Sequence, residues 1–310
     1  MEYKIGSFNM ERFGANAKKD FAKIAEIIVE ENLDVVALQE IFSEGKGVDR
    51  LLSELVKHEL YGWDVRIAEP SETKDFESRG ETYAYLWNKR RFKLVEFSKL
   101  GIKRVFDPRI VSRNDAGVDC SVLARAPFYI RLQPQYGGFY EFRLINIHIF
   151  YGDRTLSSIA RRQAEFKILT EQIYPSISTK AYGQNRKAYT IAMGDYNLNI
   201  FSPNVPTEAR NCYLSTVHTF QDGRQDIHVL TVQDQLSTLK SENSNTDSLY
   251  DTEKGYANNY DHFTYSPEWS PFVNVSFKAI DAVEKYCGGD FSYYRQNISD
   301  HLPIVMTVEI

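Results

Sequence analysis

Carboxylate and amide side chains stand at the ends of several apolar runs in this 310-residue sequence. Asn9 follows YKIGSF, Glu40 ends VVALQE, and Asp195 and Asn197 come just after TIAM. An ionised carboxylate at the end of a buried strand costs free energy unless it is paired or binds a cation. Two interpretations follow for each position, a solvated turn or part of a site that binds a cation and moves protons.

Histidines and further carboxylates repeat this pattern. His148 lies in the apolar run FRLINIHIF, either as a core histidine or as a base or phosphate contact whose tautomer a carboxylate fixes. Glu81, which opens ETYAYLWN, is either that carboxylate or an exposed edge residue. Asp300 and His301 are adjacent and cannot share one face of a strand. We expect Asp300 to face a cation and His301 to face a carboxylate such as Asp261.

The pair formed by Asp195 and Asn197 has two interpretations of equal weight. In an extended chain, residues two apart project to the same side, where an Asp and an Asn can orient a water and hold a phosphate oxygen. Both residue types also favour turns. Together with the other strand-end residues, however, the pair completes the set expected of metal-assisted phosphodiester hydrolysis, in which a divalent cation neutralises charge and an imidazole with its carboxylate handles protons.

The elements that must position these residues are predicted to be many strands and few long helices. Phe21, Ile24, Ile27 and Ile28 have helical spacing, so the chain begins as strand, helix, strand. Further helices are predicted over 49–60 and 155–174. Further strands are predicted over 63–67, 82–87, 92–97, 121–124, 128–132, 140–149, 188–193, 260–265 and 302–309. This pattern favours an α/β fold with a two-layer sheet core and helices outside.

Composition and charge exclude several classes of protein. The chain is 43% hydrophobic with a net charge of -5, which is typical of a globular protein and not of one that coats nucleic acid. Three scattered cysteines without a CxxC pair suggest neither zinc nor redox chemistry and fit a reducing compartment. No apolar run is long enough to insert in a membrane, and no signal peptide is recognised, so we expect a cytoplasmic location, with a secreted mature form left open.

No internal repeat or Pro/Gly-rich linker divides the chain, so residues 1–310 are predicted to form one domain. The polar segment 237–259 is nearly free of aliphatic residues. It is predicted to be a surface loop or insertion.

An ordered set of motifs carries a specific resemblance. SFNMERFG, ALQE, GETYAYLWN, NIHIF, MGDYNLN, YDHF and SDHLPIV resemble the endonuclease/exonuclease/phosphatase superfamily, and most closely its deoxyribonuclease I branch. The match runs over residues 3–310. The resemblance implies a four-layer sandwich of two packed mixed β-sheets flanked by helices, with the active site at one end of the sheets.

The resemblance also implies roles for individual residues. The metal ligands would be Glu40, Asn9 and Asp300; the catalytic pairs would be His301 with Asp261 and His148 with Glu81; Asp195 and Asn197 would position the attacking water and the scissile phosphate; Arg125 would contact phosphate and Tyr260 would contact nucleic acid. Oxygen ligands suit Mg²⁺, with Mn²⁺ or Ca²⁺ able to substitute, whereas the absence of a thiolate disfavours zinc.

The sequence departs from this branch outside the catalytic set. Phe42 stands where the branch has an arginine that contacts the minor groove, and Arg79 stands where it has a tyrosine. No cysteine follows GDYNLN, where Ile200 and its neighbours replace the half of a stabilising disulfide. The catalytic set is retained, while the set that reads duplex DNA is only partly present.

Three functions remain open. The leading hypothesis is a divalent-metal-dependent DNA endonuclease of low sequence specificity, restrained by a regulatory or inhibitory protein partner or in another way. The second is a superfamily phosphatase or phospholipase acting on inositol phosphates, lipid head groups or nucleotides, for which the aromatic segment 265–272 is the candidate membrane contact. DNA is the expected partner, and RNA or a small phosphoester is the alternative. The third is a non-catalytic binding module that keeps the fold alone.

Overall fold

The computed structural model describes residues 1–14, 18–58, 62–69, 80–99, 101–136, 139–153, 155–182, 186–199, 228–230, 235–240, 255–266, 269 and 273–310. Several predictions lie wholly or partly outside these ranges. They concern Arg79, Ile200, residues 241–254 of the polar segment and much of the aromatic segment 265–272.

The first of two large sheets contains both chain ends. Within the described residues it has six strands in the order β14-β15-β1-β2-β4-β3. Their bounds are Asn274–Ala279 (β14), Ile304–Glu309 (β15), Glu2–Phe13 (β1), Val35–Ile41 (β2), Thr82–Asn88 (β4) and Trp63–Ile67 (β3). β1 and β2 pair in parallel, and the other neighbours are antiparallel.

The second sheet is also mixed. Among the described residues it has seven strands, in the order β12-β13-β11-β10-β9-β5, with β8 pairing beside β9. Their bounds are His228–Leu230 (β12), Asp261–Tyr265 (β13), Lys187–Asp195 (β11), Tyr140–His148 (β10), Phe128–Pro134 (β9), Phe92–Leu94 (β5) and Arg109–Ile110 (β8). β10 and β11 are parallel. A separate hairpin joins β6 (Glu96–Lys99) to β7 (Ile102–Val105).

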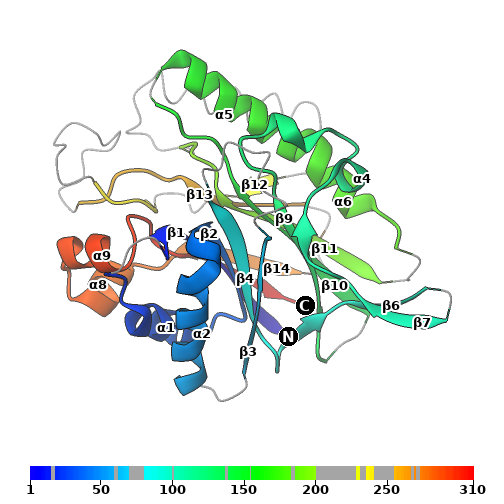
Figure 1. Ribbon diagram of the computed structural model, residues 1–310, viewed down its shortest axis with the longest axis horizontal. Coiled ribbons are helices and arrows are strands. Elements are labelled where there is room, and N and C mark those ends of the chain that lie inside the picture. Colours follow the sequence, from blue (N-terminus) through cyan, green and yellow to red (C-terminus); the bar gives the residue numbers. More distant parts are fainter. Residues whose placement is uncertain are drawn as a thin grey trace.

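Helices cover the outer faces of the two sheets, so the molecule has four layers (Figure 1). The first sheet carries α1 (Phe21–Glu30), α2 (Lys46–His58), α8 (Ala282–Cys287) and α9 (Phe291–Asn297). The second carries α4 (Arg113–Ala116), α5 (Leu156–Ile168), a π-helical turn (Leu169–Ile173) and α6 (Tyr174–Thr179). Short 3₁₀ turns span Ser43–Gly45 and Cys120–Val122. This architecture confirms the predicted four-layer α/β sandwich.

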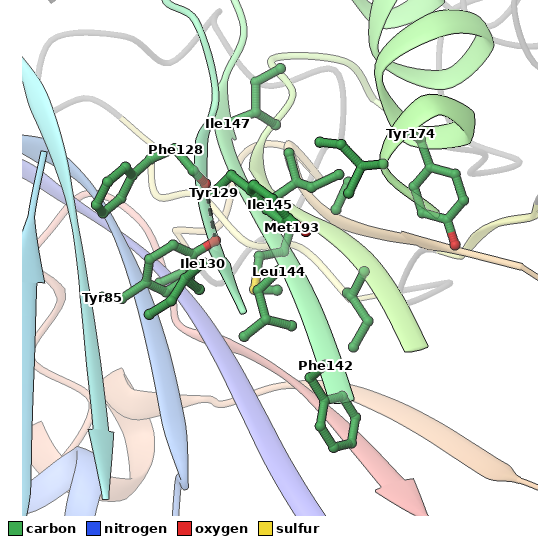
Figure 2. Close-up of a cluster of buried hydrophobic side chains, with 14 of the residues drawn as sticks. Tyr85, Phe128, Tyr129, Ile130, Phe142, Leu144, Ile145, Ile147, Tyr174 and Met193 are labelled. Atoms are coloured by element: carbon green, nitrogen blue, oxygen red, sulfur yellow. Dashed lines mark hydrogen bonds between the residues drawn. The ribbon is translucent and has the colours of Figure 1, made fainter. Parts of the chain in front are cut away.

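Apolar side chains fill the space between the sheets. Tyr85 of the first sheet packs on Phe128 of the second, with ring centroids 5.5 Å apart, and its hydroxyl donates to the Phe128 carbonyl (Figure 2). A second apolar cluster lies between the first sheet and its helices, where Ile24, Ile27 and Ile28 are fully buried. The helical spacing read from the sequence therefore corresponds to the buried face of α1.

A buried polar link also joins the sheets. Gln39 on β2 donates to the side chain of Asn146 on β10 at 2.7 Å, and the amide of Asn146 donates to the Leu38 carbonyl at 2.9 Å. Gln39 and Asn146 are both completely buried. Because buried polar groups need partners, this link fixes the register of one sheet against the other. It lies one residue before Glu40 and two before His148, at the end of the sheets that bears the candidate site.

Two strand predictions were wrong. Residues 120–122 form a 3₁₀ turn because the Asp119 side chain accepts a hydrogen bond from the Ser121 amide and starts a turn in place of the predicted strand over 121–124. The predicted strand over 92–97 is split at Val95 into β5 and β6, which belong to different sheets. Across the described part of the chain, no helix is long and apolar enough to cross a membrane.

Candidate active site

Three predicted site residues stand in one row across three adjacent strands. His148 is the register partner of Asp195 in the parallel pair β10–β11, and Asp195 is the register partner of Asp261 in the antiparallel pair β11–β13. Gly194 allows the close approach of β10 and β11, since its φ is 145° and a Cβ there would lie 1.8 Å from the Ile147 carbonyl oxygen. The sheet therefore brings together residues from distant parts of the sequence.

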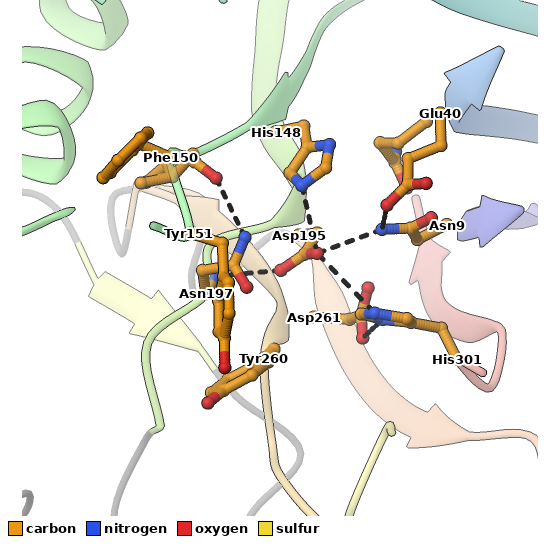
Figure 3. Close-up of polar contacts among 12 residues, drawn as sticks. Asn9, Glu40, His148, Phe150, Tyr151, Asp195, Asn197, Tyr260, Asp261 and His301 are labelled. Carbon is orange, nitrogen blue, oxygen red and sulfur yellow. Dashed lines mark hydrogen bonds and ion pairs between the residues drawn. The ribbon is translucent and has the colours of Figure 1, made fainter. Parts of the chain in front are cut away.

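Asp195 is the centre of the site (Figure 3). Its Oδ2 atom lies 3.4 Å from Nε2 of His148 and 3.7 Å from Nε2 of His301, and it accepts a hydrogen bond of 3.0 Å from the Asn9 amide. The side chain is 2% exposed. One carboxylate thus faces two imidazoles from opposite sides.

Each imidazole has its own carboxylate on the far side of the ring. His148 Nδ1 lies 2.6 Å from Oε1 of Glu81, and His301 Nδ1 lies 2.8 Å from Oδ2 of Asp261. These contacts orient both Nε2 atoms toward Asp195. Arg125 completes the first pair, because its Nε donates to the other oxygen of Glu81 at 2.7 Å.

His148 and His301 differ from ordinary histidines in their proton affinity. Burial lowers the pKa of His301, but the carboxylates of Asp261 and Asp195 outweigh it and hold that pKa well above its usual value. Burial likewise lowers the pKa of His148, but Glu81 outweighs it and raises that pKa above its usual value. Burial raises the pKa of Asp195, an effect that its two imidazole neighbours only partly reverse. In the site, two imidazoles whose protonated form is favoured by a carboxylate therefore face one further carboxylate.

An irregular backbone sets the direction of the site side chains on β1 and β2. The register of β1 and β2 shifts beyond Asn9, and Glu40 lies in this irregularity with a φ of 57°. Such bulges redirect side chains at sheet ends, at a cost in backbone strain. The Glu40 carboxylate accepts hydrogen bonds from the Asn9 amide at 3.2 Å and the Arg12 backbone at 3.0 Å. Asn9 turns its amide oxygen to the Glu11 backbone N–H at 3.1 Å.

The donor chemistry at this edge fits a hard divalent cation. Glu40 and Asp300 line the same pocket, and the Asp300 side chain is 29% exposed. Among the described residues no group of three or more His, Cys, Asp or Glu side chains has metal-ligand spacing. Two carboxylates are nevertheless sufficient for Mg²⁺, which keeps several waters and is completed by substrate phosphate. In this arrangement Asn9 supports Glu40 and Asp195 as a donor, and its predicted role as a direct ligand stays a prediction.

The polar residues after β11 form a turn and also belong to the site. The strand ends at Asp195, and the Asn197 backbone adopts a φ of 51° with its N–H bonded to Oδ1 of Asp195 at 2.8 Å. The two residues are therefore not in the extended chain that the sequence suggested. The Asn197 amide donates to the Ile149 carbonyl at 2.9 Å (Figure 3). Arg162, which the sequence analysis missed, donates to the Asn197 carbonyl at 3.1 Å.

A pocket of about 370 Å³ opens above these groups. Most of the predicted site residues line it, among them Arg125 and Tyr260, whereas Asn9, Glu81 and Asp261 lie beneath its lining. Tyr151 stands beside Tyr260 with ring centroids 6.4 Å apart. The sequence analysis did not identify Tyr151. The available signal was the position of Tyr151, three residues after His148.

The described ends of the polar segment 237–259 are largely buried, whereas the predicted surface loop over 241–254 lies outside the described residues. Ser237, Thr238 and Asn259 are buried. The Ser237 hydroxyl accepts hydrogen bonds from the backbone N–H groups of Tyr260 and Asp261, both at 3.1 Å, and Thr238 forms a β-bridge with His301. The hydrogen bonds to residues 260 and 261 and the bridge to His301 explain how this end of the segment, which has few aliphatic residues, is buried. Residues 235–240 are termed the strap from here on, and residues 238–240 line the pocket.

Comparisons with known proteins agree with this fold. The model of the Endonuclease/Exonuclease/phosphatase family matches residues 6–301. Among solved structures, Danio rerio TDP2 in complex with a single-strand DNA product is 14% identical, with a TM-score of 0.60 over 100% of this chain and 99% of that one. Caenorhabditis elegans TDP2, in a truncated form, is 16% identical, with a TM-score of 0.56 over 100% and 98%.

A Bacteroides thetaiotaomicron mannosyl-6-phosphatase is 16% identical, with a TM-score of 0.51 over 99% of this chain and 100% of that one. At such identities the likeness extends to the fold alone. None of the curated proteins compared with the chain matches it.

Proposed function

The chain belongs to the endonuclease/exonuclease/phosphatase family, whose members hydrolyse phosphoesters, and we propose that within it this protein is a divalent-metal-dependent phosphodiesterase. One observation carries the proposal. Two imidazole–carboxylate pairs converge on Asp195, with His148 Nε2 at 3.4 Å and His301 Nε2 at 3.7 Å. We further propose that the chain is one catalytic domain, because both sheets supply residues to the site.

The proposed role of each side chain in hydrolysis follows from its charge. A phosphodiester is anionic, so its transition state needs fixed positive charge and hydrogen-bond donors where charge develops. Their carboxylate neighbours raise the pKa values of His148 and His301, which favours the protonated rings, and we propose that both Nε2 atoms donate to the phosphate oxygens. Asp195 lies between them as the acceptor for a proton of the attacking water, and Asn197 fixes its orientation through the backbone bond at 2.8 Å.

A divalent cation would be held by Glu40 and Asp300. Bound Mg²⁺ would supply Lewis-acid stabilisation of the negative charge on the phosphate. Asn9 then holds the two sides of the site together, since it donates to Glu40 at 3.2 Å and to Asp195 at 3.0 Å. Arg125, beside the Glu81–His148 pair, adds positive charge at the pocket wall.

DNA is the proposed substrate, cleaved as by an endonuclease of low sequence specificity. Tyr260 and Tyr151 present aromatic rings at the pocket wall, where sugars and bases adjoining the scissile phosphate would lie. The likeness to TDP2, of which one structure holds a single-strand DNA product, supports a nucleic-acid substrate. A second candidate is a phosphatase that acts on a small phosphoester. The pocket volume of about 370 Å³ favours it, because this volume fits a small molecule.

A substrate panel tests the proposal. Purified protein is incubated with plasmid, single-stranded DNA, RNA, inositol phosphates and sphingomyelin liposomes, each with Mg²⁺ or with EDTA. The proposal expects metal-dependent cleavage of DNA above all other substrates. Release of inorganic phosphate from inositol phosphates, with DNA left intact, would replace it by the phosphatase candidate. Hydrolysis of sphingomyelin alone would point to a phospholipase.

A further inference from the structure

The floor of the pocket is a row of groups with alternating charge. Each contacts the next, at 2.7, 2.6, 3.4, 3.7, 4.0 and 3.8 Å in turn. In order, the row consists of Arg125, Glu81, His148, Asp195, His301, Asp300 and Arg295. Its centre is the Asp195 carboxylate with its two imidazoles, and its two ends are arginines. The pocket therefore has two cationic ends, of which only the Arg125 end has a proposed role.

The end formed by Arg295 is held in place by backbone. Its Nη1 donates to the carbonyls of Leu239 at 3.4 Å and Lys240 at 2.9 Å, which belong to the strap. Carbonyl acceptors orient a guanidinium without cancelling its charge. Oδ2 of Asp300 is 3.8 Å from Nη2, longer than a hydrogen bond. Arg295 lines the pocket with its side chain 22% exposed.

Lys240 adds a second cation at the same end. It lines the pocket, and its backbone is fixed on both sides, by its N–H to the Gly255 carbonyl at 2.8 Å and by its own carbonyl to Arg295. Among the described residues, the acidic groups near this end are Asp300, Glu40 and Glu11, and Glu11 pairs with Lys19 at 3.7 Å. If Glu40 and Asp300 hold a divalent cation, Lys240 and Arg295 are the described cations of this end that line the pocket.

We propose that Lys240 and Arg295 form a second anion subsite, which binds a further phosphate group of the substrate while the scissile phosphate lies at Asp195. The inference rests on the proposed function and narrows its substrate class. The preferred substrate carries two phosphates, one on each side of a nucleoside unit, and a substrate with a single phosphate leaves this end of the pocket unfilled. The second phosphate belongs either to the continuing backbone of a nucleic acid or to a terminal phosphomonoester.

Calorimetric binding to the slow variant Asp195→Asn in Mg²⁺, where Asp300 can stay engaged by the cation, tests the subsite with three thymidine ligands. TpT has one diester, TpTpT has two diesters, and pTpT has one diester and a terminal phosphomonoester. We expect about tenfold tighter binding of a two-phosphate ligand than of TpT, the size of one charge-assisted hydrogen bond. A gain for TpTpT identifies backbone as the natural occupant, and a gain restricted to pTpT identifies a terminal phosphate.

Variants of Lys240 and Arg295 test whether these two residues cause the tighter binding of a two-phosphate ligand. Lys240→Gln should remove most of the advantage of the two-phosphate ligand and leave TpT binding unchanged, and Arg295→Lys should keep more of it than Arg295→Gln. Lys103→Gln, on the exposed β6–β7 hairpin, is the matched control. Thermal unfolding of each variant checks the fold.

Equal affinities for all three ligands, no binding of any, or an equal loss for all ligands in Lys240→Gln would overturn the subsite. Because the readout is binding, a chain that binds these ligands in the expected ratio but cleaves no phosphodiester would refute the proposed function alone.

Discussion

Asp195 and His148 are register partners on two parallel strands, with Oδ2 of the carboxylate 3.4 Å from Nε2 of the imidazole. Both side chains are nearly inaccessible, so their positions are fixed by the pairing of β10 with β11 and not by flexible loops. Sites built on strands hold their geometry more accurately than sites on loops.

Replacing Asp195 by Asn should abolish most activity while preserving the fold. Asparagine keeps the oxygen that accepts the Asn197 N–H, but it removes the negative charge shared by His148 and His301. We expect kcat for a chromogenic phosphodiester to fall by about 10³-fold, with a thermal midpoint close to that of the native protein. A variant that retains activity within about tenfold would show that this carboxylate is not the proton acceptor.

Replacing Glu40 by Gln should weaken the metal dependence specifically. The amide oxygen is a poorer ligand for a hard cation than the carboxylate, so the Mg²⁺ concentration that gives half-maximal activity should rise by about tenfold or more. Mn²⁺ binding measured by electron paramagnetic resonance gives a readout that does not depend on turnover. Unchanged Mn²⁺ affinity would remove Glu40 from the proposed ligand set.

Gly194 tests how closely β10 and β11 must approach. A Cβ at this position would lie 1.8 Å from the Ile147 carbonyl oxygen, and the backbone φ of 145° is unfavourable for alanine. We expect Gly194→Ala to lower the free energy of unfolding by about 3 kcal/mol or more. The control is Gly101→Ala, with a φ of 77° and no atom within 4 Å, which should cost about 1 kcal/mol. Similar losses in urea titrations of both variants would contradict this account.

Glu31 should make the protein sensitive to acid. Burial would raise the pKa of this carboxyl, but hydrogen bonds from Lys278, Lys285 and Tyr286 outweigh it and lower the pKa to about 2. A pKa lowered in the folded state contributes stability that is present above the unfolded pKa and is lost as the pH falls toward the folded value. The window therefore lies between about pH 4.5 and 2.

Because the two lysines are half exposed, we expect Glu31→Gln to cost about 1–2 kcal/mol at pH 7. This cost should shrink as the pH falls below about 4.5 and disappear below about pH 2. Urea titrations of both proteins across this pH range measure the difference, and a cost that does not depend on pH would exclude the proposed charge effect.

Much of the site was predictable because its residues follow apolar runs that form buried strands. VVALQE and TIAMGD each end a strand at the same edge of the sandwich, so their polar ends had to come together. The residues offered Asp261 for His301 and Glu81 for His148 only as possible partners, and the family resemblance assigned both pairs, because sequence alone does not specify which strands are neighbours. For example, the pairing of Asp195 on β11 with Asp261 on β13 joins two residues that are distant in the sequence.

Other parts were not predictable from apolar patterning. The strap is held mainly by hydrogen bonds to residues 255–260 and 300–302, and Leu239 is its one buried aliphatic side chain among the described residues. β14 was missed because its side chains alternate between exposed and half-buried positions and form no apolar run. α8 did have a local signal, since Asp281 caps its first turn by accepting the Glu284 N–H, a spacing visible in DAVE.

Plasmid nicking by the native protein and by His301→Ala tests the central claim most directly. In Mg²⁺ the native protein should convert supercoiled plasmid to open circles, and EDTA should stop the reaction. His301→Ala, which removes the imidazole between Asp261 and Asp195, should be at least about 100-fold slower with an unchanged fold by circular dichroism. Nicking by His301→Ala at the native rate, or by the native protein in EDTA, would contradict the proposed metal-dependent phosphodiester hydrolysis.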